Sequence, residues 1–439
     1  MTSWRLTAYL MLCVILGGTA QSIMSYKAPL YLLSVIFLGW ILIDRDRHSL
    51  RELICPPLLF LALLPFLFIL YLIPLPAWLW SELASKSYVI EGYRLTGQDL
   101  PALPLSIAPE KTMYGLFAFL PILTTALIAR LSRTPKELKR ALLSVPIIAV
   151  AVAFLGVLQT FLGDGYLVLY EAYTLNRPVG IFSNTNHLGT FLAVALSFAA
   201  VSIFQHPRKQ TDRDRAKQKA LSIVLIILMI CVGLLTGSSA AYLLIILSAS
   251  LSLLWFSRGT YGKGAIFICW GLGAFIFAID FFVLSREFTT LLSKFSVETS
   301  ISRVRIFETT WEAIKEGGLF GYGPGSFSEV YKIYEREDEI ITRFANETHN
   351  EYLQLCFEFG IFGFLWLCGL IVWLCSQAWR LLRTSRRKSL TQKACLIGLT
   401  IIGIHSFVDY PLRTISMATI ATLLAVVLVN HGRQRSSSA

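Results

Sequence analysis

A histidine at the start of a long apolar run is the first candidate for chemistry. Thr348 and Glu351 form the Thr-x-x-Glu pattern of a capping box, which predicts that a helix begins here. His349 is then expected in the first helical turn, where free backbone N–H groups and the positive end of the helix dipole favour an anion such as phosphate. An imidazole, with an ordinary pKa near about 6.5, can also act there as a general base. The pattern predicts an active site at the water-facing start of a membrane helix.

Three arginine side chains could contribute to an anion site beside His349. Arg177, Arg303 and Arg305 lie in segments expected on the same side of the membrane as His349. Guanidinium groups form charge-assisted hydrogen bonds to phosphate and other anions. From the residues alone, two simpler interpretations stand beside this one. His349 can buttress the helix start, and Arg305 can pair with Glu308 on its own helix.

Two further groups of polar residues sit at the ends of apolar runs. Asp409 follows His405 by four residues, which favours a structural pair at a helix end over a proton relay. Asn184, Asn186 and His187 precede another apolar run, where they can cap a helix or contact a sugar. Capping is the simpler interpretation.

Metal and nucleic-acid chemistry have weaker support. The Asp-x-Asp sequences at 44–46 and 212–214 fall in basic loops, where the carboxylates are expected to be solvated rather than to bind a metal. The acidic residues of 335–339 are expected on a solvent-exposed helix face. The eight cysteines lie in or beside apolar runs without any Cys-x-x-Cys, so they are expected to be small hydrophobes rather than a disulfide or zinc framework. We predict no metal and no cofactor.

Long apolar runs must position these residues. Hydrophobic residues make up 55% of the 439 residues and the mean hydropathy is +0.63, which predicts an all-α polytopic membrane protein forming a single integral membrane domain over 1–439. Twelve transmembrane helices are expected, at about 6–24, 28–43, 54–75, 113–131, 141–162, 188–204, 220–235, 240–256, 264–284, 359–378, 394–409 and 414–430.

Charge sets the expected orientation. With a cytoplasmic N-terminus, the loops and tails on that side carry 25 Lys and Arg against six acidic residues, and the opposite side is net negative. This is the positive-inside rule, so the net charge of +12 reflects topology and contact with anionic lipid rather than nucleic acid. His349 then faces the outside of the membrane.

Segment 285–348 is the largest expected external loop, between spans 9 and 10. Val304, Phe307, Trp311 and Ile314 recur at helical spacing, and Gly317-Gly318 is expected to end that helix. A second helix is expected from the Ser326-x-x-Glu329 capping box, with an apolar face of its own. The segment 321–325 between them, GYGPG, is either a tight connector or a loop whose N–H groups meet a phosphate.

These motifs resemble those of a known membrane family. The O-antigen ligase pattern is His, then Asn, Ser or Gln, nine variable residues, Gly, two variable residues, and Gly, Thr or Tyr, filled here by His349, Asn350, Gly360 and Gly363. Residues 177–187 (RPVGIFSNTNH), 305–311 with 321–327, and 405–412 (HSFVDYPL) are similar to further motifs of the O-antigen ligase and polymerase superfamily, in the same order. One departure is Ser238-Ser239-Ala240, where the family often has Ser-Arg-Gly.

The resemblance implies a metal-independent GT-C glycosyltransferase of the bacterial inner membrane. It would transfer a glycan from undecaprenyl diphosphate to a lipid A-core hydroxyl at the periplasmic face, with His349 as base. Arg177, Arg303, Arg305, Asn186 and Asn350 would bind the diphosphate and glycan, and Asp409, His405 and Glu351 would support the site. The nearest alternatives are the related polymerase and a protein O-glycosylating relative. A flippase or other transporter also suits twelve spans, but it predicts midmembrane charges and internal repeats.

Overall fold

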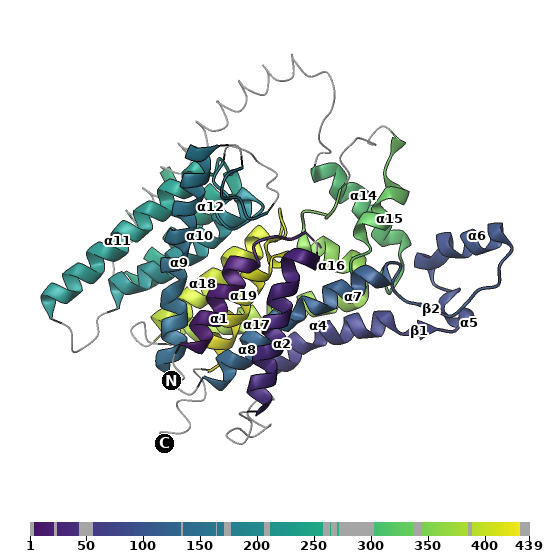
Figure 1. Cartoon of the computed structure of the whole chain (residues 1–439), viewed down its shortest axis with the longest axis horizontal. Helices are drawn as coiled ribbons and strands as arrows, with labels where there is room; N and C mark the ends of the chain where they lie inside the picture. Colours follow the sequence, from purple (N-terminus) through teal and green to yellow (C-terminus); the bar gives the residue numbers. More distant parts are fainter. Residues whose placement is uncertain are drawn as a thin grey trace, which may run out of the picture.

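Helices dominate the structure. The computed structural model describes residues 4–21, 24–43, 56–132, 135–163, 165–170, 177–205, 211–257, 264, 270–271, 303–337, 345–384 and 389–430. Most of these residues are helical (Figure 1), so the predicted all-α class is confirmed. Within the described ranges the one sheet is a short antiparallel pair, β1 (Pro74–Leu75) with β2 (Leu103–Pro104).

Where they are described, the predicted membrane segments are largely helical, but residues 17–21, 406–409 and Pro74–Leu75, predicted within spans, lie outside the helices. The helices are, in chain order, α1 (Arg5–Leu16), α2 (Met24–Ile43), α4 (Pro56–Leu72), α7 (Pro109–Phe117) with α8 (Phe119–Leu131), α9 (Pro135–Leu162), α10 (Thr185–Phe204), α11 (Asp212–Leu235), α12 (Ser239–Phe256), α17 (Ile361–Leu382), α18 (Leu390–His405) and α19 (Ile415–Asn430). The predicted span 264–284 lies almost wholly outside the described residues. Among the residues that the structure describes, seven helical stretches are long and apolar enough to cross a bilayer, and α1, α4, α18 and α19 are apolar but shorter. These features support a multi-pass membrane protein, and the count of twelve stays a prediction.

Helix α10 is the centre of the bundle. Its side chains from His187 to Val201 are buried, and it packs against α9, α11, α12 and α18. Small residues permit this close packing, since a Cβ added at Gly189 would lie only 2.2 Å from the Cβ of Ala241 on α12. A tightly packed α10 gives firm support to the polar residues at its N-terminus.

A smaller packed unit lies beside the bundle. It contains α14 (Arg303–Glu316), α15 (Phe327–Tyr334) and α16 (Glu351–Phe359), drawn in green in Figure 1. The helices α5 (Ala77–Trp80) and α6 (Ser87–Thr96), the 3-10 turn η2 (Ala84–Lys86) and the β pair follow α4 and extend to one side. The predicted end of α14 before Gly317 and start of α15 after Ser326 are confirmed.

The predicted apolar face of α14 is only partly correct. Val304 and Trp311 are 63% and 56% exposed, whereas the buried side chains of α14 are Ile306, Thr309, Thr310 and Ala313. Helix α14 packs against α15 and α16, and small side chains such as Ala313 allow close contact that a tryptophan would prevent. The face predicted for α15 is confirmed, because Phe327, Val330 and Tyr331 are buried.

The glycine-rich segment 321–325 is a connector. The N–H groups of Tyr322 and Gly323 donate to the carbonyls of Phe357 (3.1 Å) and Glu358 (2.8 Å), near the C-terminal end of α16. Gly321 has a φ of +65°, and a Cβ there would lie 2.5 Å from the Phe357 oxygen. The N–H groups of Tyr322 and Gly323 therefore bind carbonyls at the end of a helix, which would otherwise lack partners. Because these two donors are occupied, the structure favours the connector over the phosphate-binding loop for them.

The expected orientation has a direct test. Glu337 is exposed in the segment that follows α15. A cysteine at this position should react with a membrane-impermeant thiol reagent in intact spheroplasts, because the charge pattern places the segment outside. A cysteine at Arg213, in a predicted cytoplasmic loop, should react only after lysis. The reverse labelling pattern would contradict the predicted topology.

Candidate active site

The conformation of His349 is unusual. Helix α16 begins at Glu351, so the prediction that His349 lies in the first helical turn is wrong. The N-cap is Asn350, whose Oδ1 accepts hydrogen bonds from the N–H groups of Tyr352 (3.1 Å) and Leu353 (3.0 Å). Asparagine caps helices at least as well as threonine, which explains why the cap moved from Thr348. His349 has a φ of +55°, in the left-handed region that residues other than glycine seldom adopt.

Hydrogen bonds on both sides hold this strained residue. Thr348 Oγ1 accepts from the Asn350 N–H (3.1 Å), and the Thr348 N–H donates to Gln354 Oε1 (3.2 Å). Strained backbone persists only where its surroundings fix it, and such residues cluster at functional sites. The strain at His349 therefore supports a functional role.

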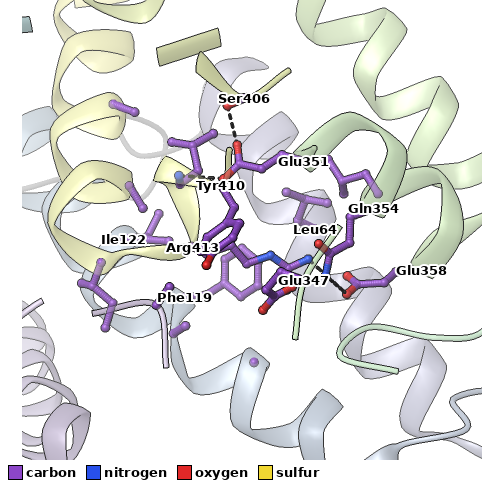
Figure 2. Close-up of a pocket in the computed structure, with 18 of the residues that line it drawn as sticks. Leu64, Phe119, Ile122, Glu347, Glu351, Gln354, Glu358, Ser406, Tyr410 and Arg413 are labelled. Atoms are coloured by element: carbon purple, nitrogen blue, oxygen red, sulfur yellow. Dashed lines mark hydrogen bonds and ion pairs between the residues drawn. The ribbon is translucent and has the colours of Figure 1, made fainter. Parts of the chain in front are cut away.

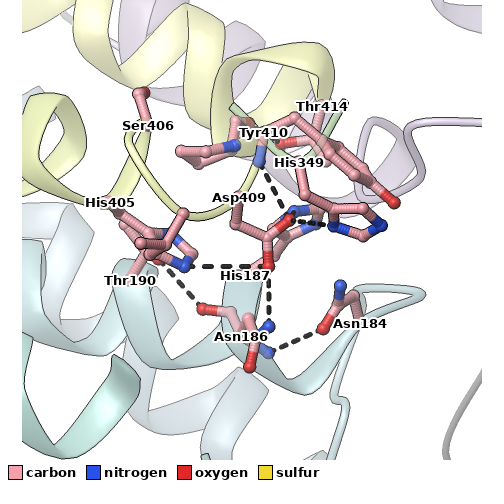
Figure 3. Close-up of polar contacts among 12 residues, drawn as sticks. Asn184, Asn186, His187, Thr190, His349, His405, Ser406, Asp409, Tyr410 and Thr414 are labelled. Carbon is pink, nitrogen blue, oxygen red and sulfur yellow. Dashed lines mark hydrogen bonds and ion pairs between the residues drawn. The ribbon is translucent and has the colours of Figure 1, made fainter. Parts of the chain in front are cut away.

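The buried carboxylate of Asp409 is the centre of a polar cluster (Figure 3). His187 Nε2 and His349 Nδ1 lie 3.6 and 3.7 Å from Oδ1, and His405 Nε2 lies 3.8 Å from Oδ2. Asn186 Nδ2 donates to Oδ2 at 2.6 Å. Because a buried charge without partners is costly, these groups are needed to stabilise the Asp409 carboxylate.

Tyr410 orients two of the imidazoles. Its N–H donates to Asp409 Oδ1 at 2.9 Å. Its ring centroid lies 4.9 Å from that of His349 and 5.4 Å from that of His187. The residue after the carboxylate thus forms a wall against both rings.

The start of α10 contributes the amide of the cluster. Asn184 is the N-cap of α10 and accepts from the Asn186 N–H at 2.8 Å, so the predicted capping role is correct for Asn184. Asn186 has another role, because its Oδ1 accepts from Ser238 Oγ (2.7 Å) while its amide nitrogen binds Asp409. Its side chain therefore links α10 and the start of α12 to the carboxylate.

His405 is held on both sides of its ring. Its Nδ1 lies 2.6 Å from Thr190 Oγ1 on α10, and its Nε2 faces Asp409. The predicted pairing of His405 with Asp409 at the helix end is present in this geometry. Since Thr190 also donates to the Asn186 carbonyl at 2.9 Å, His405 is part of the scaffold that holds the amide and the carboxylate together.

Arg303 reaches this cluster from the outer unit. Its Nη1 donates to the Val408 carbonyl at 2.8 Å, and its Nη2 lies 4.0 Å from Asp409 Oδ2. Nearly half of the Arg303 side chain is exposed, so the guanidinium can also meet a ligand. Arg305 is two residues further along α14 and is exposed.

Arg177 lies at the edge of the same region. Its Nη1 donates to the Gly237 carbonyl at 3.1 Å, and a Cβ added at Gly237 would lie 2.9 Å from Arg177 Cζ. The next residue, Ser238, binds Asn186. The structure therefore connects Arg177 to the cluster through one loop.

Glu351 closes the turn that carries Asp409. Its N–H donates to the Ser406 carbonyl (2.9 Å), and its carboxylate accepts from Ser406 Oγ (2.5 Å) and from the Leu412 N–H (2.7 Å). Ser406 and Leu412 stand three residues before and after Asp409. Burial raises the pKa of Glu351 to about 7, because desolvation disfavours its charged form.

A second group of charged residues lies at a cavity of about 890 Å³ (Figure 2). Arg413 Nη2 lies 3.0 Å from Glu358 Oε1, and its Nη1 lies 3.7 Å from Glu347 Oε2. Gln354 donates to Glu358 at 3.0 Å and also to Glu347. Burial raises the pKa of Glu358. Tyr410 and His187 also line this cavity, so the two groups are neighbours.

Metal binding has no geometric support in the described part of the chain. No three His, Cys, Asp or Glu side chains are grouped there in a way that could hold a metal ion. The described cysteines are free thiols (Cys13, Cys231, Cys356, Cys368, Cys375 and Cys395). Metal independence of the activity stays a prediction.

The fold and the cluster define a multi-pass helical membrane protein with a carboxylate and imidazoles gathered at one end of its bundle. The family model described as O-Antigen ligase matches residues 224–368, a range that includes α14, α15, α16 and His349. This match covers about a third of the chain and confirms the resemblance predicted from the motifs. A comparison with curated proteins gave no match.

The structure adds polar residues that the sequence did not single out: Lys27, Thr190, Glu347, Glu358 and Arg413. Ionisable side chains within or beside apolar segments are expensive and usually functional, and this rule could have identified Lys27, Glu358 and Arg413. Thr190 carries no such signal, because a hydroxyl on a membrane helix is common.

Glu351 is expected to make the cluster sensitive to pH. Its pKa in the folded protein lies above the ordinary value, so its stabilising contribution is complete below about pH 4.5 and is lost as the pH rises through about 7. Glu351→Gln stays neutral; its Oε1 can accept from the Leu412 N–H and its Nε2 can donate to Ser406 Oγ. We expect its thermal midpoint to depend less on pH than that of the wild type between about pH 5 and 8.

Glu351→Ala serves as the comparison. It removes the bridge across the Asp409 turn, and we expect transfer to fall on the order of tenfold or more through misplacement of the carboxylate. An unchanged pH dependence in Glu351→Gln, or wild-type turnover in Glu351→Ala, would contradict this role.

Proposed function

We propose that the protein is an O-antigen ligase, which transfers a glycan from undecaprenyl diphosphate to a hydroxyl of lipid A-core at the periplasmic face of the inner membrane. The observation that carries the proposal is the strained His349 with its Nδ1 facing the buried Asp409 carboxylate at 3.7 Å. A carboxylate behind one ring nitrogen orients the imidazole and leaves the other nitrogen to accept a proton. The family match to residues 224–368 supports this class of reaction.

In the proposed step, His349 Nε2 takes the proton of the acceptor hydroxyl. The hydroxyl oxygen then attacks the anomeric carbon of the donor sugar, and the bond from that carbon to the diphosphate oxygen breaks. The electron pair leaves with undecaprenyl diphosphate, while the proton stays on His349. Asp409 stabilises the resulting imidazolium, and the 3.7 Å separation has to shorten by about 1 Å to form a full hydrogen bond.

Arginines are proposed to stabilise the departing diphosphate. Arg303 lies beside the cluster and is half exposed, which supports this role. Ser239 stands where the family often has an arginine. Arg177 is proposed to take the role of that arginine, because its guanidinium lies against Gly237 in the same loop. Bidentate contacts to phosphate oxygens suit a guanidinium better than an ammonium.

The related polymerase and protein O-glycosylation reactions would use the same bond changes with another acceptor. Purified protein supplied with labelled lipid-linked glycan and each acceptor separately would distinguish them by the product that accumulates. Transfer to lipid A-core is the expected result. No covalent product with any acceptor, together with movement of intact lipid-linked glycan across vesicles, would support a transporter instead.

His349→Ala should abolish transfer while leaving insertion and folding intact, because the substitution removes a base but little buried volume. Loss of a general base costs on the order of a hundredfold or more in rate. His206→Ala, in a predicted cytoplasmic loop, is the matched control and should keep wild-type turnover. If His349→Ala keeps near-wild-type turnover at saturating substrates, His349 is structural only.

Removal of Arg303 should raise the KM for the lipid-linked donor. Arg303→Ala is expected to weaken donor use more than Arg303→Lys, and lysine should rescue only in part because a point charge cannot reproduce a two-pronged contact. Arg305→Ala, on the same helix, tests the other arginine, and Arg94→Ala on α6 is the exposed control. Equal donor KM values in all of these variants would exclude the proposed diphosphate contact.

Transfer should also survive EDTA, since the proposed step needs only His349 and the arginines. Turnover would be measured in the purified protein before and after chelation, and again with added magnesium or manganese. Activity lost in EDTA and restored by either ion would overturn the metal-independent mechanism.

A further inference from the structure

The cavity of about 890 Å³ differs chemically from the Asp409 cluster beside it. Most of its wall is apolar and comes from membrane helices, with Leu64, Phe119, Ile122, Trp366, Leu370 and Ala425 among the lining residues. Its size lies within the range typical of ligand sites. Charged side chains also line it: Lys27, Lys111, Glu347, Glu351, Glu358 and Arg413. The combination of an apolar wall and charged residues suits an amphiphile with a polar head and a long chain.

Two buried polar side chains at the cavity are short of partners. Lys27 is 8% exposed, and its Nζ makes one long bond, 3.5 Å to the Ala20 carbonyl, among the contacts found in the described ranges. His187 is fully buried; its Nε2 faces Asp409 at 3.6 Å, and its Nδ1 has no hydrogen-bond partner within the described chain. Buried donors and acceptors are normally satisfied, so such groups at a cavity point to a missing ligand.

The charges at the cavity favour hydroxyl groups over a diphosphate. Glu347 and Glu358 share Arg413 and Gln354, which leaves carboxylate oxygens able to accept from sugar hydroxyls. Lys27, Lys111 and Arg413 are matched by three carboxyl groups at the cavity, so it does not present the excess of positive charge that a diphosphate requires. The arginines proposed to bind the donor diphosphate, Arg177 and Arg303, are not among the lining residues.

The cavity is also within reach of the proposed base. Glu347 and His349 are separated by one residue, so their Cα atoms are at most about 7 Å apart. Tyr410 lines the cavity and its ring packs on His349. A glycan held at Glu347 therefore has a short path past Tyr410 to His349.

We propose that this cavity is the acceptor subsite, and that the acceptor carries its own lipid. In this arrangement the hydroxyl-rich head binds Lys27, Glu347 and Glu358, and the apolar chain lies against α4, α8, α17 and α19. The inference rests on the proposed function and sharpens it, because it assigns the acceptor a binding cavity apart from the arginines proposed for the donor.

The test uses the full chain in phospholipid nanodiscs with labelled undecaprenyl-diphosphate-linked glycan as donor. The acceptor is supplied in two forms, lipid A-core and the core oligosaccharide freed of its lipid. Ala425→Phe places a ring at the apolar wall and should raise the KM for lipid A-core on the order of tenfold, while the KM values for the free oligosaccharide and for the donor stay unchanged. Unchanged turnover with the free oligosaccharide also shows that the variant is folded. Ala151→Phe, at an exposed position of α9, is the matched control and should leave all three values unchanged.

Lys27→Met tests the polar end. It should raise the KM for both acceptor forms on the order of tenfold with kcat unchanged, because it removes a charged donor to the shared head. Arg94→Met, an exposed charge on α6, is its control.

The outcomes separate the two proposals. Acceptor KM values that do not change in Ala425→Phe and Lys27→Met, or a donor KM that rises instead, would overturn the acceptor subsite while leaving the ligase proposal intact. Absence of transfer by the wild type to any acceptor would refute the proposed function itself.

Discussion

The carboxylate of Asp409 is the group on which the arrangement of the site depends. It has no exposed surface, and it is surrounded by three imidazoles, the amide of Asn186 and the guanidinium of Arg303. A buried charge of this kind is tolerated only when its partners are held in place. The five partners come from four elements, since His187 and Asn186 both lie on α10, so satisfying one carboxylate ties α10, α14, α18 and the segment before α16 together.

Helix α16 carries much of that constraint. Asn350 caps its first turn, Glu351 closes the Asp409 turn, and Glu358 near its last turn binds Arg413. A nine-residue helix has little stability alone, and these polar contacts together with the docked segment 321–325 fix its position. The strained φ of His349 follows from this, because the chain must enter a helix whose position is already set.

The sequence predicted the helical class and most element positions because apolar runs and helix stops are local signals. It also placed His349, Asp409, Asn186 and Arg303 in the motifs that meet in space, although their meeting could not be read from periodicity. The capping box was misassigned because Thr348 and Asn350 are both good caps, and only the tertiary bonds of Glu351 decide between them. The buried face of α14 was missed in part because the packing of Ala313 and Thr309 is set by neighbours distant in the chain. The cavity could not be predicted from the sequence for the same reason, since residues from helices as far apart as α2 and α19 line it.

The Asp409 cluster and the charged residues at the cavity are neighbours, and Tyr410 belongs to both. Each group pairs carboxylates with cationic or imidazole side chains, which allows a membrane protein to hold several charges near its bundle. The Asp409 cluster balances one carboxylate with an arginine and imidazoles, and the cavity balances two carboxylates with Arg413. Tyr410 stands between them, with its ring against His187 and His349 and its N–H on Asp409. Tyr410 and His187 belong to both groups, so a molecule bound in the cavity would lie against side chains that also hold Asp409 in place.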